Sequence, residues 1–165
     1  MEPTTPVYSR AAVTQILEMV KDPEVPVLSI SDMGIIKDVN LDGEAVTVQI
    51  MPTYSGCPAM DVISEDIQTI LTLHGYKDFK IETVLSPAWS SDFISESGRQ
   101  KLREYGIAPP EKGAGKAGLM HIAEIACPQC GSHKTEVVSE FGSTACKALY
   151  KCSDCLEPFD YFKCV

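Results

Sequence analysis

The stretch IIKDVNLDGEAVTVQIM, residues 35–51, sets the architecture of the first half of the chain. Two strands, 36–41 and 45–51, are predicted on either side of Asp42-Gly43, a dipeptide typical of a tight hairpin turn. In the second strand, apolar side chains alternate with polar ones, as a sheet with one buried face requires. The buried side chains of that strand are expected to be Val46, Val48 and Ile50.

Helices are predicted on both sides of this hairpin. Ser9 can cap a helix that runs to about Val20, and the two prolines of DPEVPV, residues 22–27, end it. A second helix is predicted from Pro58 to about His74, because its apolar residues recur at helical spacing. A third strand is expected within 79–84. The first domain is therefore α+β, with a small, three-stranded, mostly antiparallel sheet and packed helices.

The composition places a domain boundary after residue 106. A last helix is predicted to start at Ser91 or Ser95 and to end near Gly106, before the Pro/Gly/Lys-rich stretch PPEKGAGKAG. We therefore predict a first domain over 8–106, a linker over 107–119 and a small C-terminal domain over 120–165.

Cysteine spacing identifies the C-terminal domain as a zinc-ribbon β domain. Two C-x2-C pairs, separated by 21 residues, predict four thiolate ligands for one tetrahedral metal: Cys127, Cys130, Cys152 and Cys155. Zinc is favoured, and iron is the alternative because a rubredoxin-like site uses the same ligands. The metal either holds the fold or takes part in iron chemistry or metal transfer. Cys146 and Cys164 are left over, as small buried side chains or as ligands that replace one of the four or bind a second metal.

Cys57 is the lone cysteine of the first domain. It lies in Ser55-Gly56-Cys57-Pro58, and because Pro58 suits the first position of a helix, Cys57 is predicted at the N-cap. A cysteine there is a nucleophile, a metal ligand or a cap without further chemistry. Asp22 and Glu24 are the nearest candidates for additional ligands, although solvated loop acids are the simpler interpretation.

No catalytic constellation accompanies Cys57. His74 lies at the far end of the same predicted helix, about 25 Å away at 1.5 Å per residue, and His121 and His133 belong to the ribbon. The sequence lacks a Glu-x-x-His pair for a di-iron site and a Gly-rich dinucleotide turn. We therefore expect an accessory protein and no enzyme.

Charge and hydropathy restrict the partners. The net charge is −9 and no basic patch is present, so nucleic acid is not an expected partner. No apolar run approaches the roughly 20 residues of a membrane span, and the first residues do not form a signal peptide. We expect a cytoplasmic protein that does not contact the membrane.

Two motifs of the first half resemble the SufT-like domain of iron–sulfur cluster assembly. They are DPEVPVLSISDMGIIKDV, residues 22–39, and PTYSGCP, residues 52–58. That family shows a D-P-E-[IV]-P start, an [LM]-G-[IL]-[IV] strand entry and a T-x-x-G-C-P loop, although its loop is usually richer in threonine. The resemblance covers roughly residues 8–106. It implies a role in maturing iron–sulfur proteins, with Cys57 in transient contact with iron or a cluster.

Three further segments resemble the PaaD-type accessory family of the bacterial phenylacetyl-CoA epoxidase system: SPAWSSDFISESGRQKLREYGIAPP (86–110), CPQCGS (127–132) and SEFGSTACKALYKCSDCLEPFDYFKC (139–164). This resemblance implies an accessory role in aerobic phenylacetate degradation. The expected partners are the iron–sulfur reductase or the di-iron oxygenase component, one of which the protein would help to mature. Two alternatives remain: a non-catalytic interaction module whose ribbon docks an epoxidase subunit, and an electron-transfer component with iron in the ribbon.

Overall fold

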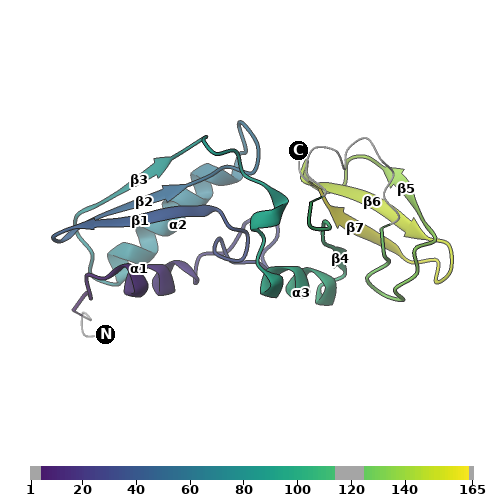
Figure 1. The fold of residues 1–165 in the computed structure, drawn as a ribbon, viewed down its shortest axis with the longest axis horizontal. Helices are drawn as coiled ribbons and strands as arrows, with labels where there is room; N and C mark the ends of the chain where they lie inside the picture. The colour runs from purple at the N-terminus through teal and green to yellow at the C-terminus, as the bar shows by residue number, and fades with distance from the viewer. Residues whose placement is uncertain (1–4, 114–124, 164–165) are drawn as a thin grey trace. The chain divides into compact units, whose positions relative to one another are not determined.

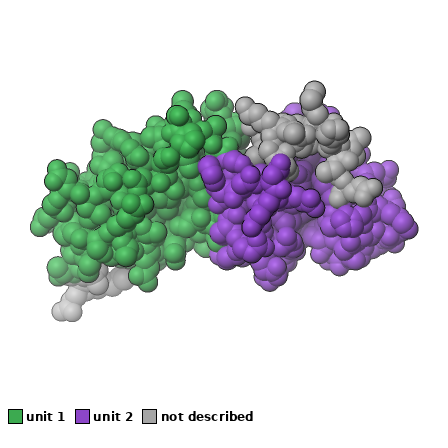
Figure 2. All heavy atoms as spheres, viewed as in Figure 1, with its two compact units in different colours: residues 1–89 green, residues 90–165 purple. Residues whose placement is uncertain are grey.

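The computed structural model describes residues 5–113 and 125–163, and the chain divides into two compact units, Met1–Trp89 and Ser90–Val165 (Figure 2). The described part of the first unit contains two helices and three strands (Figure 1), in the order α1 (Arg10–Leu17), β1 (Ile36–Asp42), β2 (Ala45–Ile50), α2 (Ala59–Leu73) and β3 (Phe79–Thr83). None of the helices in the described ranges is long and apolar enough to cross a membrane.

The sheet of the first unit has the strand order β1-β2-β3. β1 and β2 form the predicted antiparallel hairpin, closed by the pair Asp42↔Ala45, and Gly43 in the turn has a φ of +59°. β3 pairs with β2 in parallel, from Val46↔Phe79 onward. The α+β class is confirmed, but the sheet is mixed rather than mostly antiparallel, because α2 crosses between β2 and β3 and returns the chain in the same direction.

Amphipathic patterns build the core of this unit. In β2 every second residue is buried, as the alternation predicted. The apolar face of α2 supplies further buried side chains: Met60, Ile63, Ile67 and Leu71. Ser9 caps α1 as expected, since its hydroxyl accepts a hydrogen bond of 3.2 Å from the amide of Ala12.

The second unit begins with a short helical region and ends in a four-stranded sheet. Its elements are η1 (Ser91–Phe93), α3 (Glu96–Glu104), β4 (Ile107–Ala108), β5 (Thr135–Ser139), β6 (Lys147–Cys152) and β7 (Pro158–Phe162). The strand order is β4-β7-β6-β5, with β4 parallel to β7 and the other pairs antiparallel. Ser95 caps α3 by accepting a hydrogen bond of 2.9 Å from the amide of Gly98.

β4 lies inside the predicted linker, yet it belongs to the ribbon sheet. Ile107 and Ala108 are both buried, and they pair with Asp160 and Tyr161 of β7. A two-residue strand has no periodicity to reveal it, and the prolines that follow suggested a loop. The predicted domain limits, 8–106, 107–119 and 120–165, stay predictions. The sequence boundary between the two compact units falls between Trp89 and Ser90.

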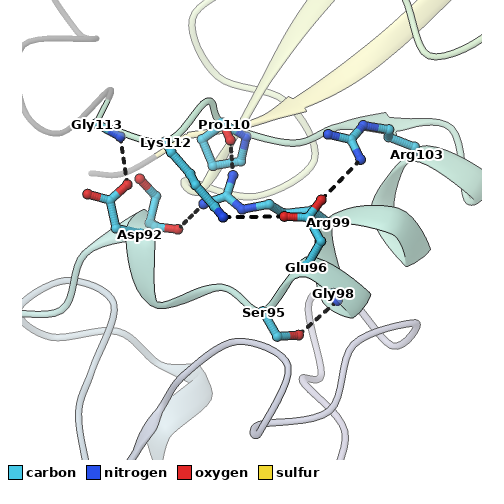
Figure 3. Close-up of polar contacts among 10 residues, drawn as sticks. Asp92, Ser95, Glu96, Gly98, Arg99, Arg103, Pro110, Lys112 and Gly113 are labelled. Atoms are coloured by element: carbon cyan, nitrogen blue, oxygen red, sulfur yellow. Dashed lines mark hydrogen bonds and ion pairs between the residues drawn. The ribbon is translucent and has the colours of Figure 1, made fainter.

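A buried arginine fastens the chain after β4 to the helical region (Figure 3). Arg99 of α3 is 3% exposed, and its guanidinium donates to the carbonyl oxygens of Pro110 and Ser91, the latter at 2.6 Å. Two contacts reinforce this attachment, a Lys112–Glu96 ion pair of 3.4 Å and a 2.7 Å hydrogen bond from the Gly113 amide to the Asp92 carboxylate. Residues 110–113 are therefore held in place by α3 and η1.

Candidate metal centre

The first Cys pair forms a tight turn that aims two sulfurs at one point. The amide of Gly131 donates to the carbonyl of Cys127 at 2.8 Å, and the amide of Cys127 donates to the carbonyl of Ser132 at 2.9 Å. Gly131 has a φ of +74°, in the left-handed region that glycine adopts without strain. The residue after the second cysteine thus lets the chain reverse directly behind Cys130.

The second Cys pair repeats this turn with a different residue at its critical position. Cys152 ends β6, and its amide donates to the carbonyl of Glu157 at 3.0 Å. Leu156, which corresponds to Gly131, has a φ of +66°, the one positive φ of a non-glycine residue in the described parts of the chain. An L-residue in this conformation costs roughly 1–2 kcal/mol. The second knuckle is therefore strained where the first is relaxed.

The four cysteine sulfurs converge into one group. All lie within 4.8 Å of one another, with Sγ–Sγ distances of 3.7 Å for Cys127–Cys155 and 3.6 Å for Cys130–Cys152. Four thiolates bound tetrahedrally at a Zn–S distance of about 2.3 Å would be about 3.8 Å apart. The four sulfurs and their spacing therefore fit a tetrahedrally coordinated ion such as Zn²⁺. Fe²⁺ would be bound by the same four sulfurs.

A small apolar cluster supports this sulfur group from one side. It contains the side chains of β4, β6, β7 and the segment before the first knuckle: Ala108, Ile125, Ala148, Tyr150 and Phe159. Cys127 and Cys152 are buried in it, whereas Cys130 is exposed. The metal site thus has a buried half that joins the core and an exposed half at the surface.

The ionisation of the four thiols depends on their partners. The backbone amide of Cys155 is the main cause that lowers the pKa of Cys152 to about 7. The amide of Glu157 lowers the pKa of Cys155, but burial and the three other thiols outweigh it and raise that pKa to about 12. Four thiolates this close repel one another, so a bound cation is needed to keep all of them ionised.

We expect metal binding by this site to weaken steeply as the pH falls. A proton on a ligand thiol competes with the metal, so the stabilisation from metal is greatest at high pH and declines as the pH falls through the thiol pKa values, from about 12 for Cys155 to about 7 for Cys152. Each proton displaced on binding changes the apparent affinity by about tenfold per pH unit. Titration against a chelator at pH 6, 7 and 8 measures this slope, and an affinity independent of pH would contradict it.

A polar bridge connects the two knuckles at the surface. The carboxylate of Asp154 accepts a 2.6 Å hydrogen bond from the hydroxyl of Ser132 and forms a 3.2 Å ion pair with Lys134. The Ser132 hydroxyl, followed by Lys134, lowers the pKa of this carboxylate. Both charged side chains are largely exposed, so the bridge orients the knuckles but adds little stability.

Cys57 belongs to the first unit, where it lies in the loop between β2 and α2. It is 9% exposed, and its sulfur lies 3.9 Å from the hydroxyl of Thr53. Gly56, with a φ of +77°, turns the backbone just before it. α2 begins at Ala59 with Pro58 as its N-cap, one residue later than predicted, so Cys57 precedes the cap.

Asp22 and Glu24 are not assembled with Cys57 into a metal site. Across 5–113 and 125–163, the four ribbon cysteines are the sole group of three or more Cys, His, Asp or Glu side chains spaced for a metal. Asp22 is buried, and one of its oxygens accepts hydrogen bonds of 2.8 Å from the amides of Glu24 and Val25. This carboxylate shapes the proline-rich loop, a role that Asp commonly has in turns.

Two other cysteines occur in the second unit, and the structure describes one of them. Cys146 is buried near β6, 3.0 Å from the hydroxyl of Thr144 and outside the sulfur group. Cys164 and His121 lie outside the described residues. Sequence reasoning missed Leu156, although its place directly after the second C-x2-C, where the first has glycine, was a usable signal.

Comparison with known proteins relates this architecture to a family. Residues 112–163 match the PaaD zinc beta ribbon domain, and residues 10–83 match the iron–sulfur cluster assembly protein family. A protein of Escherichia coli K12, provisionally named as the D component of 1,2-phenylacetyl-CoA epoxidase, is 46% identical over 151 residues, 91% of this chain and 90% of that protein. The chain belongs to the PaaD family. The resemblance inferred from the sequence motifs is thereby confirmed.

Smaller relatives match part of this PaaD-family chain. An "Fe-S protein maturation auxiliary factor" of Porphyromonas gingivalis is 35% identical over 54% of the chain and 87% of the relative. The factor SufT of Staphylococcus aureus, named in the same way, is 35% identical over 51% and 97%. A crystal structure of a domain of unknown function from Bacillus anthracis superposes with a TM-score of 0.53 at 25% identity, covering 56% of this chain and 90% of that one. Two of these three proteins are named as maturation auxiliary factors and not as enzymes, which agrees with the expectation of a non-enzymatic chain.

Proposed function

We propose that this protein is an accessory factor that helps to mature an iron-containing component of the phenylacetyl-CoA epoxidase system. The observation that carries the proposal is the union, in one chain, of an iron–sulfur assembly domain over 10–83 with a PaaD ribbon over 112–163. The clients we infer are the iron–sulfur reductase or the di-iron oxygenase component. The near full-length similarity to the E. coli epoxidase component supports this choice of system.

Cys57 is the residue that we assign to contact with iron or a cluster. It is the cysteine of the assembly domain, and its loop lies between the end of β2 and the start of α2, a helix whose N-cap residue Pro58 makes no side-chain hydrogen bond. Thiolate sulfur is the usual ligand of iron–sulfur clusters. Asp22, whose carboxylate is occupied by backbone amides, is a weaker candidate ligand than the sequence suggested.

The ribbon metal has a separate role in this proposal. We infer that zinc, held by Cys127, Cys130, Cys152 and Cys155, stabilises the second unit. A unit with so small an apolar cluster depends on metal binding for its folding free energy. The ribbon then supplies a fixed surface for contacts with an epoxidase subunit.

Replacing Cys57 with serine tests the proposal. In cells that express the epoxidase system, Cys57→Ser should leave the client component without most of its iron, because serine removes the thiolate but keeps the loop intact. Iron and acid-labile sulfide in the purified reductase and oxygenase are measured. Cys146→Ser, at another buried cysteine outside the sulfur group, is the matched control and should behave like the unchanged protein. Full iron content with Cys57→Ser would overturn the role of Cys57.

A non-catalytic interaction module is the second candidate function. The low exposure of Cys57, at 9%, and the absence of nearby metal-spaced ligands in the described ranges favour it. If it holds, capture of purified epoxidase subunits survives Cys57→Ser but not loss of Cys152, and client iron is unaffected by Cys57→Ser.

Electron transfer through iron in the ribbon is the third alternative, and metal analysis separates it from the others. Protein purified without oxygen should contain zinc if our proposal holds, because closed four-thiolate sites of this kind are usually structural zinc sites. Zinc-loaded, iron-free protein that fully restores client maturation would exclude electron transfer by the ribbon.

A further inference from the structure

The two knuckles of the metal centre share one backbone turn but differ in the residue that closes it. Gly131 and Leu156 each follow the second cysteine of a pair, with φ values of +74° and +66°. Glycine adopts this conformation freely, and a leucine there is strained by its Cβ. Such strain persists when the surroundings enforce it, and it is concentrated at functional positions.

Nothing in the described part of the second unit compensates for the strain by burying the leucine. The Leu156 side chain is 66% exposed, and the apolar cluster beneath the metal centre includes Cys155 but not Leu156. A glycine at this position would satisfy the same turn without strain. The chain therefore keeps an unfavourable backbone conformation and displays an apolar side chain beside the metal.

The surroundings of Leu156 are acidic. Four thiolates around one divalent cation carry a net charge of about −2, and the exposed Cys130 brings part of this charge to the surface. Glu157, the next residue along the chain, is exposed, and Asp154 lies two residues before Leu156. Lys134 is paired with Asp154, and the exposed Lys151 lies opposite Pro158 in the β6–β7 hairpin, so the two lysines balance the two carboxylates and the charge of the metal-bound thiolates remains. An apolar side chain thus protrudes from a negatively charged rim.

We propose that Leu156 is the anchor of a docking surface for an epoxidase protein subunit, and that it enters an apolar recess bordered by lysine or arginine side chains. The docking surface comprises the two knuckle tips, residues 129–131 and 153–157. The inference rests on the proposed function, because it takes the partner from the epoxidase system. Because the rim around Leu156 is negatively charged, the partner's recess is expected to have positively charged residues at its border. An apolar anchor within a polar rim is typical of protein interfaces.

Two substitutions that tolerate the left-handed conformation test the anchor without disturbing the turn. Leu156→Gly and Leu156→Asn should retain the metal, and Leu156→Gly should raise the thermal midpoint because it removes the strain. Both should weaken binding to the purified partner subunit by at least about tenfold, the loss expected for a buried apolar anchor. Leu85→Gly is the matched control, since Leu85 is 68% exposed in the first unit and should bind as the unchanged chain does.

Binding is measured with the full-length, metal-loaded protein against each purified epoxidase component, at low and high salt. Weaker binding at high salt supports the basic border, and binding that does not depend on salt overturns it. Unchanged affinity of both Leu156 variants overturns the anchor, as does loss of metal from both, which would place Leu156 within the metal site itself. If these variants bind normally while Cys57→Ser still deprives the client of iron, the docking proposal fails and the proposed function stands.

Discussion

Replacing Cys152 with alanine should abolish metal binding and unfold the ribbon while the first unit stays folded. Cys152 is buried at the end of β6, with its sulfur 3.6 Å from that of Cys130. Structural zinc sites contribute on the order of 10–16 kcal/mol of binding free energy, far more than the apolar cluster beneath these sulfurs can supply. Metal analysis and amide hydrogen exchange would show loss of metal and of protection over 125–163, with protection of β1 to β3 retained.

Cys146→Ala is the control for this experiment. Cys146 is also buried and lies just before β6, but its sulfur is not in the four-sulfur group. Loss of a small buried side chain there should cost about 1 kcal/mol and leave the metal in place. Retention of metal and of ribbon protection in Cys152→Ala would contradict the ligand assignment, and loss of metal in Cys146→Ala would make Cys146 a ligand.

Replacing Arg99 with alanine should destabilise the second unit by about 3–5 kcal/mol. The substitution leaves the carbonyl oxygens of Ser91 and Pro110 without their donor, and each buried unpaired group costs about 1–3 kcal/mol. The volume of the lost side chain adds a cavity term. Chemical unfolding of the metal-loaded protein, followed by a probe in the second unit, measures the change.

Arg103→Ala provides the matched control on the same helix. The Arg103 side chain is 48% exposed and pairs with Glu96 at 4.0 Å, so its removal should change the free energy of unfolding by about 0.5 kcal/mol or less. Equal effects of the two substitutions would show that the Arg99 hydrogen bonds do not hold residues 110–113 against α3.

Local patterns were sufficient to predict most of the first unit. The Asp42-Gly43 turn fixed the hairpin, and the helical spacing from Met60 to Leu71 fixed α2, because these signals depend on neighbouring residues alone. The expectation of a mostly antiparallel sheet was wrong at β3, which runs parallel to β2. The helix predicted between these two strands was itself the signal for parallel pairing, because a helical crossover returns the chain in the same direction.

The four-cysteine group was predictable because metal geometry imposes its spacing on the sequence. β4 was not predictable, because two residues without periodicity join the sheet only through β7. The burial of Arg99 has no local signal either, since α3 is rich in charged residues and carries one large apolar side chain, Leu102. The conformation of Leu156 follows from the knuckle turn, and the glycine at the same place after the first cysteine pair, Gly131, was the local signal for it.

The parallel pairing of β4 with β7 affects the order in which the two units can fold during synthesis. Ile107 pairs with Asp160, which lies more than fifty residues further along the chain. This pairing cannot form until the ribosome has made β7. At about 5–20 residues per second, roughly three to ten seconds separate the synthesis of the two partners. The first unit has all its strands by residue 83 and can fold during that interval. Closure of the ribbon sheet, which needs β7 as well as β4, can therefore follow only after residues 160 and 161 have been made.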